Sequence, residues 1–240
     1  MSNINLKDIQ QKLYEKLKPS GWADKLKGFI LSEDFHNILK ELLSQSQNGA
    51  RFTPVLKQLF RAFEECPYNE LKVIMIGQDP YPKAEVADGI SFSCGNTLQV
   101  QASLKYIFKE IDDTIYRDKE YADKLTFHPD LARWSNQGVL MLNTALTTTV
   151  GKIGVHVELW KPFLTYLFDM LSSYNTGLVY VFMGNKAKEW RTHIGKNNFK
   201  FFTSHPASAA YQGAQRWNSG DVFNQVNKVL MDHYKTQITW

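Results

Sequence analysis

The sequence predicts an α/β fold in a single domain over residues 1–240, with a central four-stranded parallel sheet flanked by helices and a helical N-terminal part. Four short apolar segments have the length and composition of buried strands. Segments with helical spacing separate these strands, and strands that alternate with helices form parallel sheets through right-handed crossovers. No internal repeat, low-complexity tract or linker interrupts the sequence, which favours one domain.

The first third of the chain has the periodicity of amphipathic helices. One helix is predicted behind a cap at Ser32, with an apolar face of Phe35, Ile38, Leu39, Leu42 and Leu43. A second helix is predicted behind Thr53 and Pro54, because a capping residue followed by proline at the first helical position is a common helix start. Its apolar face consists of Val55, Leu56, Leu59, Phe60 and Phe63.

The rest of the chain alternates between strands and helices. The predicted strands cover residues 71–76, 139–142, 178–183 and 199–203. The first is followed by a helix with Leu104, Ile107, Phe108 and Ile111, for which Ser103 is the predicted cap. The second is followed by a long loop and a helix with Phe163, Tyr166, Leu167 and Met170, and the last helix contains Val222, Val226 and Val229.

The composition narrows the class of protein. An apolar share of 43% is ample for a core, whereas no apolar run reaches the length of a membrane span and the N-terminus lacks a signal-peptide pattern. Cys66 and Cys94 form neither a disulfide framework nor the paired spacing of a zinc site, so we expect reduced thiols in a cytoplasmic protein. We also expect a monomer. The net charge of +4 permits a polyanionic partner without requiring one.

Polar residues of the kind that bind ligands follow each predicted strand. They are Gln78 and Asp79, Asn143 and Thr144, Asn185 and Lys186, and His205 and Ser208. In an open parallel sheet, ligands bind beyond the carboxyl ends of the strands, which lie at one edge. The sequence therefore predicts that these four pairs converge on one active-site cleft.

The loop after the first strand, Gly77-Gln78-Asp79-Pro80-Tyr81-Pro82, is predicted to be rigid. Each proline fixes its own φ and shifts the preceding residue towards extended conformations. Such a loop holds Asp79 in place as a candidate general base or electrostatic stabiliser. For an isolated loop, a structural turn with an incidental acid is an equally common interpretation.

Three further side chains are candidates for ligand binding. Asn143 offers a donor and an acceptor side by side and can pair with an N–H next to a C=O, as in a pyrimidine imide, although a turn-forming role explains an isolated asparagine equally well. His205 could donate to an oxygen that gains charge, and Phe92 could stack on a flat ligand, although single residues of these types are more often structural. Their proximity to Asp79 favours function. The other histidines, including His128, His156 and His193, show no ligand spacing, so no metal is expected.

The motifs of this chain resemble those of family 1 uracil-DNA glycosylases over roughly residues 70 to 230. Gly77-Gln78-Asp79-Pro80-Tyr81 resembles the family's water-activating loop, and Phe92 follows at the family's spacing. Leu142-Asn143-Thr144 with Leu146-Thr147 resembles the second motif, Gly184 the loop after the third strand, and Ser204-His205-Pro206 the start of the third motif. The resemblance is specific because the motifs occur in the right order at the ends of the right strands.

The resemblance implies an enzyme that flips uracil out of DNA and hydrolyses its N-glycosidic bond. Phe92 would stack on the base, Asn143 would read its N3–H and O4, and Tyr81 would fill the space that a thymine methyl group needs. Asp79 would activate water and stabilise an oxocarbenium-like sugar. Neutral His205 would donate to O2 of the departing base.

The resemblance also implies contacts of the loop backbone with base and water, and contacts of the protein with DNA. The backbone around Gln78 would complete the base and water contacts, and no metal or organic cofactor is required. The expected partner is uracil-containing DNA, single- or double-stranded, with no membrane partner. Ser103, Ser208, Ala209 and Tyr211 are the expected DNA contacts.

The chain departs from the family pattern in three places. Pro82 stands where most members have histidine, and residues 99–103 replace a proline-rich loop and keep only its serine. Ala209 stands at the position of an intercalating leucine. Tyr211 is the candidate replacement for that leucine, with Arg216 and Trp217 as alternatives and packing beneath the loop as a non-functional interpretation of Tyr211.

Two other functions are alternatives for a chain of this kind. The chain could be a catalytically weak glycosylase-fold subunit that binds DNA in a replication or repair complex, but the presence of both Asp79 and Asn143 argues against that. It could also be an ordinary nucleotide-binding α/β enzyme, but no glycine-rich phosphate loop follows any strand.

Overall fold

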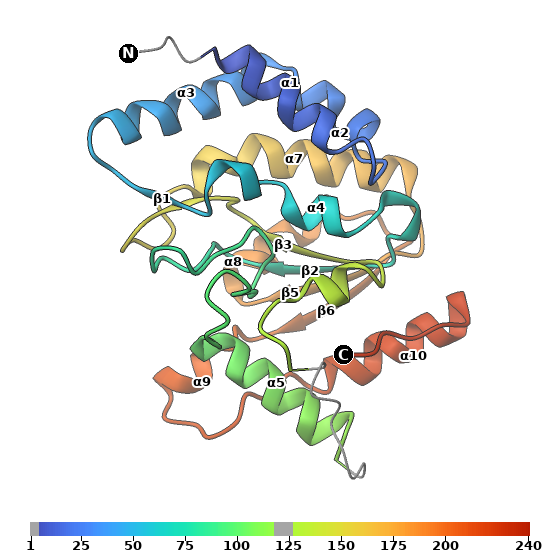
Figure 1. Cartoon of the computed structure of the whole chain (residues 1–240). Coiled ribbons are helices and arrows are strands. Elements are labelled where there is room, and N and C mark those ends of the chain that lie inside the picture. The colour runs from blue at the N-terminus through green and yellow to red at the C-terminus, as the bar shows by residue number, and fades with distance from the viewer. Residues whose placement is uncertain (1–4, 118–126) are drawn as a thin grey trace.

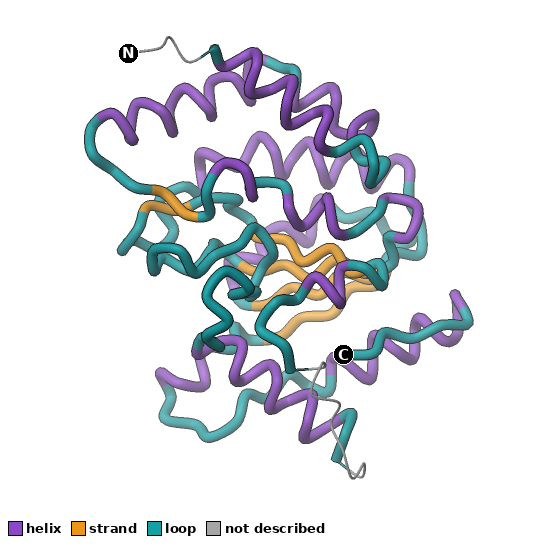
Figure 2. The backbone as a smooth tube through the Cα atoms, in the orientation of Figure 1, coloured by secondary structure: helices purple, strands orange, loops and turns teal. Residues whose placement is uncertain are grey.

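The computed structural model describes residues 5–117 and 127–240, except for the side chains of Ala210 and Tyr211. Its centre is a sheet, whose strands are orange in Figure 2. The sheet has four strands in the order β3-β2-β5-β6, and every neighbouring pair is parallel. The strands are β2 (Val73–Gly77), β3 (Val139–Asn143), β5 (Val179–Met183) and β6 (Phe199–Thr203). This sheet, together with the helical N-terminal region, confirms the predicted fold class.

The register of the sheet brings the ends of the strands level. Gly77 at the end of β2 lies opposite Asn143 at the end of β3, and Met183 lies opposite Thr203 at the ends of β5 and β6. All residues of β2, β3 and β5 are buried, as continuous apolar runs predict for a sheet that is covered on both faces. The loops that follow these strands therefore start from one rigid edge.

Helices cover the sheet on both sides. Figure 1 shows α1 (Leu6–Lys16), α2 (Ala23–Ile30) and α3 (Glu33–Gln47) as an outer layer above α7 (Val157–Tyr174) and α4 (Arg61–Glu65). The opposite side carries α5 (Ala102–Thr114), α9 (Ser208–Tyr211) and α10 (Val222–Tyr234). The remaining elements are short: β1 (Phe52–Thr53), η1 (Leu56–Gln58), η2 (Tyr68–Glu70), α6 (Ala132–Ser135), β4 (Thr148–Thr149), α8 (Asn185–Lys188) and η3 (Glu189–His193).

Aromatic contacts attach the N-terminal helices to the rest of the core. Phe29 on α2 lies 5.2 Å from Phe163 on α7 between ring centroids, and Phe35 on α3 lies 5.8 Å from Phe60. The rings are tilted, an arrangement that aromatic pairs favour over face-to-face stacking. The helical layer is thereby part of the same core as the sheet.

Of three predicted helix starts, one agrees with the structure. The cap at Ser32 is confirmed, since its hydroxyl accepts a hydrogen bond from the N–H of Phe35. The helix predicted behind Thr53 is wrong, because Thr53 is extended and pairs with Thr148 in the small β1–β4 sheet, so that only η1 and the short α4 follow. The cap at Ser103 is also wrong, because α5 begins at Ala102 and Gln101 is its N-cap.

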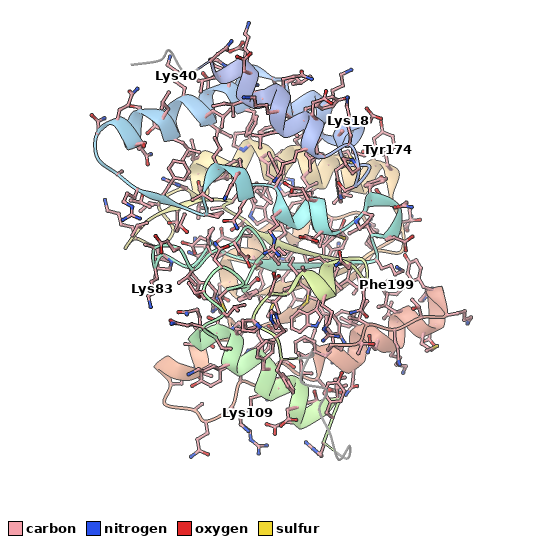
Figure 3. All side chains as sticks on the ribbon, viewed as in Figure 1. Lys18, Lys40, Lys83, Lys109, Tyr174 and Phe199 are labelled. Carbon is pink, nitrogen blue, oxygen red and sulfur yellow. The ribbon has the colours of Figure 1, made fainter. Side chains whose placement is uncertain are left out.

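The outer surface carries scattered basic side chains. Lys18, Lys40, Lys83 and Lys109 are exposed and lie well apart from one another in the view of Figure 3. Lys83 lies in the loop between β2 and α5. No helix within the described residues is both long and apolar enough to cross a bilayer.

Candidate active site

A cleft of about 460 Å³ opens beyond the carboxyl ends of the strands. Its walls come from the loop after β2, the start of α5, the loop after β4 and the loop after β6. They consist of Gln78, Asp79, Pro80, Tyr81, Pro82, Phe92, Gln101, Ala102, Ser103, Ile153, His205, Ala207 and Ser208. The cleft therefore unites residues that are far apart in the sequence, as the parallel sheet predicts.

Asp79 is half-buried in the wall of this cleft. Its Oδ2 accepts a hydrogen bond of 2.6 Å from the backbone N–H of Gly154. Burial raises the pKa of the Asp79 carboxyl, and the Gly154 hydrogen bond lowers it. The carboxylate is thus held by one donor and keeps acceptor capacity for a water molecule.

Backbone hydrogen bonds join the loop after β2 to the loop after β3. The carbonyl of Gln78 accepts from the N–H of Ala145 at 2.9 Å and from the hydroxyl of Thr144 at 2.8 Å. The N–H of Thr144 donates to the carbonyl of Gly77 at 3.1 Å. These bonds fix the position of Asp79 relative to Asn143.

His205 stands on the opposite loop of the cleft. Burial lowers the pKa of its imidazole, which favours the neutral form. Nδ1 accepts a hydrogen bond of 3.2 Å from the N–H of Ala207, so the proton of the neutral ring is on Nε2. Gly184 has φ +96° and packs against His205: a Cβ atom at position 184 would lie 3.0 Å from the histidine Cβ. The site thus presents a neutral N–H donor.

Two aromatic side chains of the cleft, Tyr81 and Phe92, have contacts with other groups of the site. The ring centroid of Phe92 lies 5.7 Å from that of His205. The hydroxyl of Tyr81 donates to the carbonyl of Phe92 at 3.1 Å, and burial raises the pKa of this hydroxyl. Phe92 has φ +63°, a conformation that is uncommon for a residue with a bulky side chain. Backbone strain at such a residue is often found at functional sites.

Asn143 lies deeper than the cleft. It borders a small inner cavity that shares Pro80, Tyr81 and Phe92 with the cleft walls. Its Oδ1 accepts a hydrogen bond of 2.8 Å from the hydroxyl of Ser91. The amide is therefore positioned behind the two aromatic rings.

The predicted convergence holds for the pairs after β2 and β6, which line the cleft, and is wrong for the pair after β5. Of the pair after β3, Asn143 borders the adjoining inner cavity and Thr144 binds the carbonyl of Gln78. Asn185 and Lys186 are exposed at the start of α8, and they are absent from the cleft walls. Lys186 forms an ion pair of 2.9 Å with Glu189. These residues begin a helix after Gly184, which turns their side chains to solvent.

The predicted DNA contacts differ in their placement. Ser103 and Ser208 line the cleft, whereas Ala209 is 4% exposed and belongs to the core. The side chain of Tyr211 lies outside the described part of the structure.

The two alternatives to Tyr211 have other partners. Trp217 is 2% exposed, and its indole N–H donates to the hydroxyl and the carbonyl of Ser204, so it packs beneath the loop. Arg216 is exposed and pairs with Asp113 on α5 at 3.2 Å. The burial of Trp217 argues against a role as an intercalating side chain.

Sequence analysis did not predict the residues that support the site. Thr147 Oγ1 lies 2.9 Å from His156 Nδ1, and His156 Nε2 lies 2.9 Å from Gln45 Oε1 on α3. The indole N–H of Trp160 donates to Thr147 at 2.7 Å. This buried series of hydrogen bonds anchors the loop that contains Gly154. No local sequence signal identifies such a series, because its members come from distant segments.

No cluster of His, Cys, Asp or Glu that could hold a metal ion occurs among residues 5–117 and 127–240. The expectation that the reaction needs neither metal nor organic cofactor remains a prediction from the resemblance.

The fold and site define the class of protein: a parallel α/β protein whose cleft combines a carboxylate and a neutral imidazole, with a buried amide in the adjoining inner cavity. The model of the Uracil DNA glycosylase superfamily matches residues 63–231. The chain belongs to this superfamily, which confirms the resemblance noted in its motifs.

Individual relatives agree with this assignment. The uracil-DNA glycosylase of Campylobacter concisus is 33% identical over 99% of this chain and 96% of its own length. That of Dichelobacter nodosus is 34% identical over 87% of this chain and 89% of its own. The crystal structure of mimivirus uracil-DNA glycosylase superposes with a TM-score of 0.80 at 26% identity, covering 99% of this chain and 89% of that one.

Proposed function

We propose that this chain is a DNA repair enzyme that hydrolyses the N-glycosidic bond of deoxyuridine in DNA and releases uracil, with Asp79 and His205 as its catalytic residues. Membership of the superfamily and relatives named uracil-DNA glycosylase support the activity. The observation that supports the residue roles is the meeting of Asp79, Phe92 and His205 in one cleft, with Asn143 directly behind it.

Base recognition is assigned to the inner end of the cleft. Uracil enters past Tyr81 and stacks on Phe92, and Asn143 pairs with its edge by accepting from N3–H and donating to O4. Cytosine presents the opposite order of donor and acceptor and leaves buried groups unpaired, which is a strong basis for rejection. The ring of Tyr81 excludes the methyl group of thymine.

The chemistry at the sugar is assigned to Asp79. The glycosidic bond breaks with its electron pair passing to uracil N1, while the oxygen of a water molecule forms the new bond to C1′. The Asp79 carboxylate orients this water, accepts its proton, and stabilises the positive charge that develops on the sugar. Gly154 holds the carboxylate for this task, and the backbone around Gln78 completes the contacts of base and water.

Stabilisation of the leaving group is assigned to His205. Negative charge develops on O2 of uracil as the bond breaks, and the Nε2–H of a neutral imidazole can donate to it. Donors that are already in place stabilise such charge more effectively than water does. The lowered pKa of His205 favours the neutral ring, and the bond from Ala207 favours the tautomer that this role requires.

The DNA itself is assigned to the outer rim of the cleft. Ser103 and Ser208 line the cleft and can donate to phosphate oxygens. Single- and double-stranded DNA are both proposed as substrates, with Tyr211 as the side chain that fills the stack in duplex DNA. The monomeric state, the absence of a membrane partner and the cytoplasmic location remain predictions from the sequence.

Multiple-turnover kinetics test this function against that of a catalytically weak DNA-binding subunit. A uracil-containing oligonucleotide is supplied in excess over the protein, and the released base is identified by mass. Many molecules of free uracil per protein molecule, with far fewer for Asp79→Asn, support the enzyme. Tight DNA binding with no released uracil would favour the binding subunit.

A further inference from the structure

Ser91 contacts the amide of Asn143 from inside the protein. Its hydroxyl donates to Asn143 Oδ1 at 2.8 Å, and both side chains are buried. The N–H of Ser91 donates to the carbonyl of Met141 at 3.0 Å. Since Met141 and Asn143 belong to the same strand, β3, the hydroxyl is fixed relative to the amide that it contacts.

Gly77 closes the other side of this contact. A Cβ atom at position 77 would lie 2.7 Å from Ser91 Oγ, 2.8 Å from Asn143 Oδ1 and 3.1 Å from Phe92 Cζ. Gly77 thus leaves room for the three groups to meet. Its Cα methylene offers no hydrogen-bond acceptor to the amide.

This environment favours one of the two orientations of the Asn143 amide. With the oxygen inward, Oδ1 accepts from Ser91 and lies against the methylene of Gly77. With the NH₂ group inward, one N–H could donate to the Ser91 oxygen, but the other would face the methylene. A buried donor without a partner is costly, so the oxygen-inward orientation is preferred.

We propose that Ser91 is a positioning residue for base selectivity, which sets the orientation in which Asn143 meets the base. This inference rests on the proposed role of Asn143 as the residue that reads the pyrimidine edge. The second lone pair of Oδ1 is then available for N3–H of uracil, and the amide N–H groups for O4. The reversed amide would match cytosine, so the orientation decides which base is accepted.

The test measures single-turnover rates on oligonucleotides that contain uracil or cytosine, with enzyme in excess. Loss of one hydrogen bond between neutral groups predicts that Ser91→Ala lowers the uracil rate about threefold to tenfold. It should also raise the cytosine-to-uracil rate ratio, which a purely structural defect would leave unchanged. Ser91→Cys keeps a weak donor of similar size and should give an intermediate uracil rate. It also serves as the variant to measure should Ser91→Ala fold poorly.

Ser135→Ala is the matched control, because Ser135 is a buried serine on α6 outside both cavities, and its rates should equal those of the wild type. Ser91→Ala in an Asn143→Ala background completes a double-mutant cycle. If Ser91 acts through Asn143, its removal there has no further effect. An equal loss in the wild-type and Asn143→Ala backgrounds, or an unchanged cytosine-to-uracil rate ratio, would overturn the proposed role of Ser91. The proposed role of Asn143 would still stand. A wild-type uracil rate for Asn143→Ala would overturn the proposed role of Asn143 in base recognition, on which this inference rests.

Discussion

The Asp79 carboxylate and the Gly154 backbone N–H are joined by a hydrogen bond of 2.6 Å across 75 positions of sequence. The donor is a main-chain group, so its presence depends on the conformation of the loop and not on a side chain. Gly154 has φ +74°, which suits glycine, and the buried series of hydrogen bonds through His156 anchors the same loop. The geometry of the proposed catalytic carboxylate therefore depends on a distant part of the fold.

Asp79→Asn is expected to lower kcat strongly and to raise thermal stability at neutral pH. Burial raises the pKa of Asp79, so its ionised form is disfavoured in the folded state and the carboxylate costs stability above that pKa. The amide oxygen of asparagine can still accept from Gly154. Thermal unfolding should show a higher Tm for the variant at pH 7.5.

The gain in Tm should shrink as the pH falls towards the ordinary carboxyl pKa of about 3.9, and below that pH both the folded and the unfolded state bind the proton. Stability that is unchanged at pH 7.5 would argue against a desolvated carboxylate. Wild-type turnover by Asp79→Asn would remove Asp79 from the mechanism.

His205→Ala is expected to bind uracil-containing DNA nearly as well as the wild type and to react far more slowly. The donor acts on charge that develops only in the transition state, so its loss falls on kcat. Removal of one such donor costs on the order of 10²–10³ in rate. Single-turnover kinetics beside a binding titration measure both quantities, and an unchanged rate would refute the role.

The same mechanism predicts the acid limb of the pH profile. Activity requires an ionised Asp79 and a neutral His205, and burial moves the pKa of the first up and that of the second down. The wild-type kcat/KM should therefore be constant near neutrality and fall at a pH between about 3.9 and 6.5, the ordinary values of the two groups. A loss of activity that begins above pH 6.5 would contradict the lowered pKa of His205.

Much of this fold and site could be predicted from the sequence, and the failures have physical causes. The strands were predicted to within about two residues because continuous apolar runs identify a buried sheet. The helix behind Thr53 was wrong because pairing with Thr148, almost a hundred residues away, decides the backbone conformation there. Asp79, Asn143 and His205 were placed by the rule that parallel strands end at one edge.

The supporting groups could not be predicted. The Gly154 N–H has no signature in the sequence, since every residue except proline has such a group. Ser91 is recognisable only once β3 brings Asn143 to it, and the contact of Gln45 with His156 spans 111 positions. Local sequence patterns indicate which side chains are polar, whereas the tertiary fold determines which groups those side chains contact.

Selectivity at the two ends of the pyrimidine can be changed separately. Tyr81→Ala should open space for a methyl group and admit thymine. Asn143→Asp replaces the amide donor by an acceptor, so it should lose activity on uracil and gain some on cytosine. A good contact to a base edge contributes roughly 1–3 kcal/mol of discrimination, which competition between labelled oligonucleotides can measure. Wild-type uracil rates for Asn143→Asp would exclude Asn143 as the reader.

Tyr211→Ala is expected to slow excision from duplex DNA much more than from single strands. Flipping a nucleotide from a duplex leaves a gap in the stack, and the buried Ala209 offers only a methyl group to fill it. A 2-aminopurine next to the uracil reports flipping directly. Arg216→Ala is the comparison variant, since Arg216 is exposed and paired with Asp113. Equal losses on both substrates would indicate a packing role for Tyr211. A duplex defect found only in Arg216→Ala would indicate that Arg216, and not Tyr211, fills the gap in the stack.

The most direct measurement of the central claim uses three labelled oligonucleotides that contain uracil, thymine or cytosine at one position. Each is incubated with the protein in excess EDTA, and abasic sites are then cleaved with alkali. The account predicts cleavage at uracil and at neither of the other bases. Intact uracil strands, cleavage at thymine or cytosine, or activity that requires added metal would contradict it.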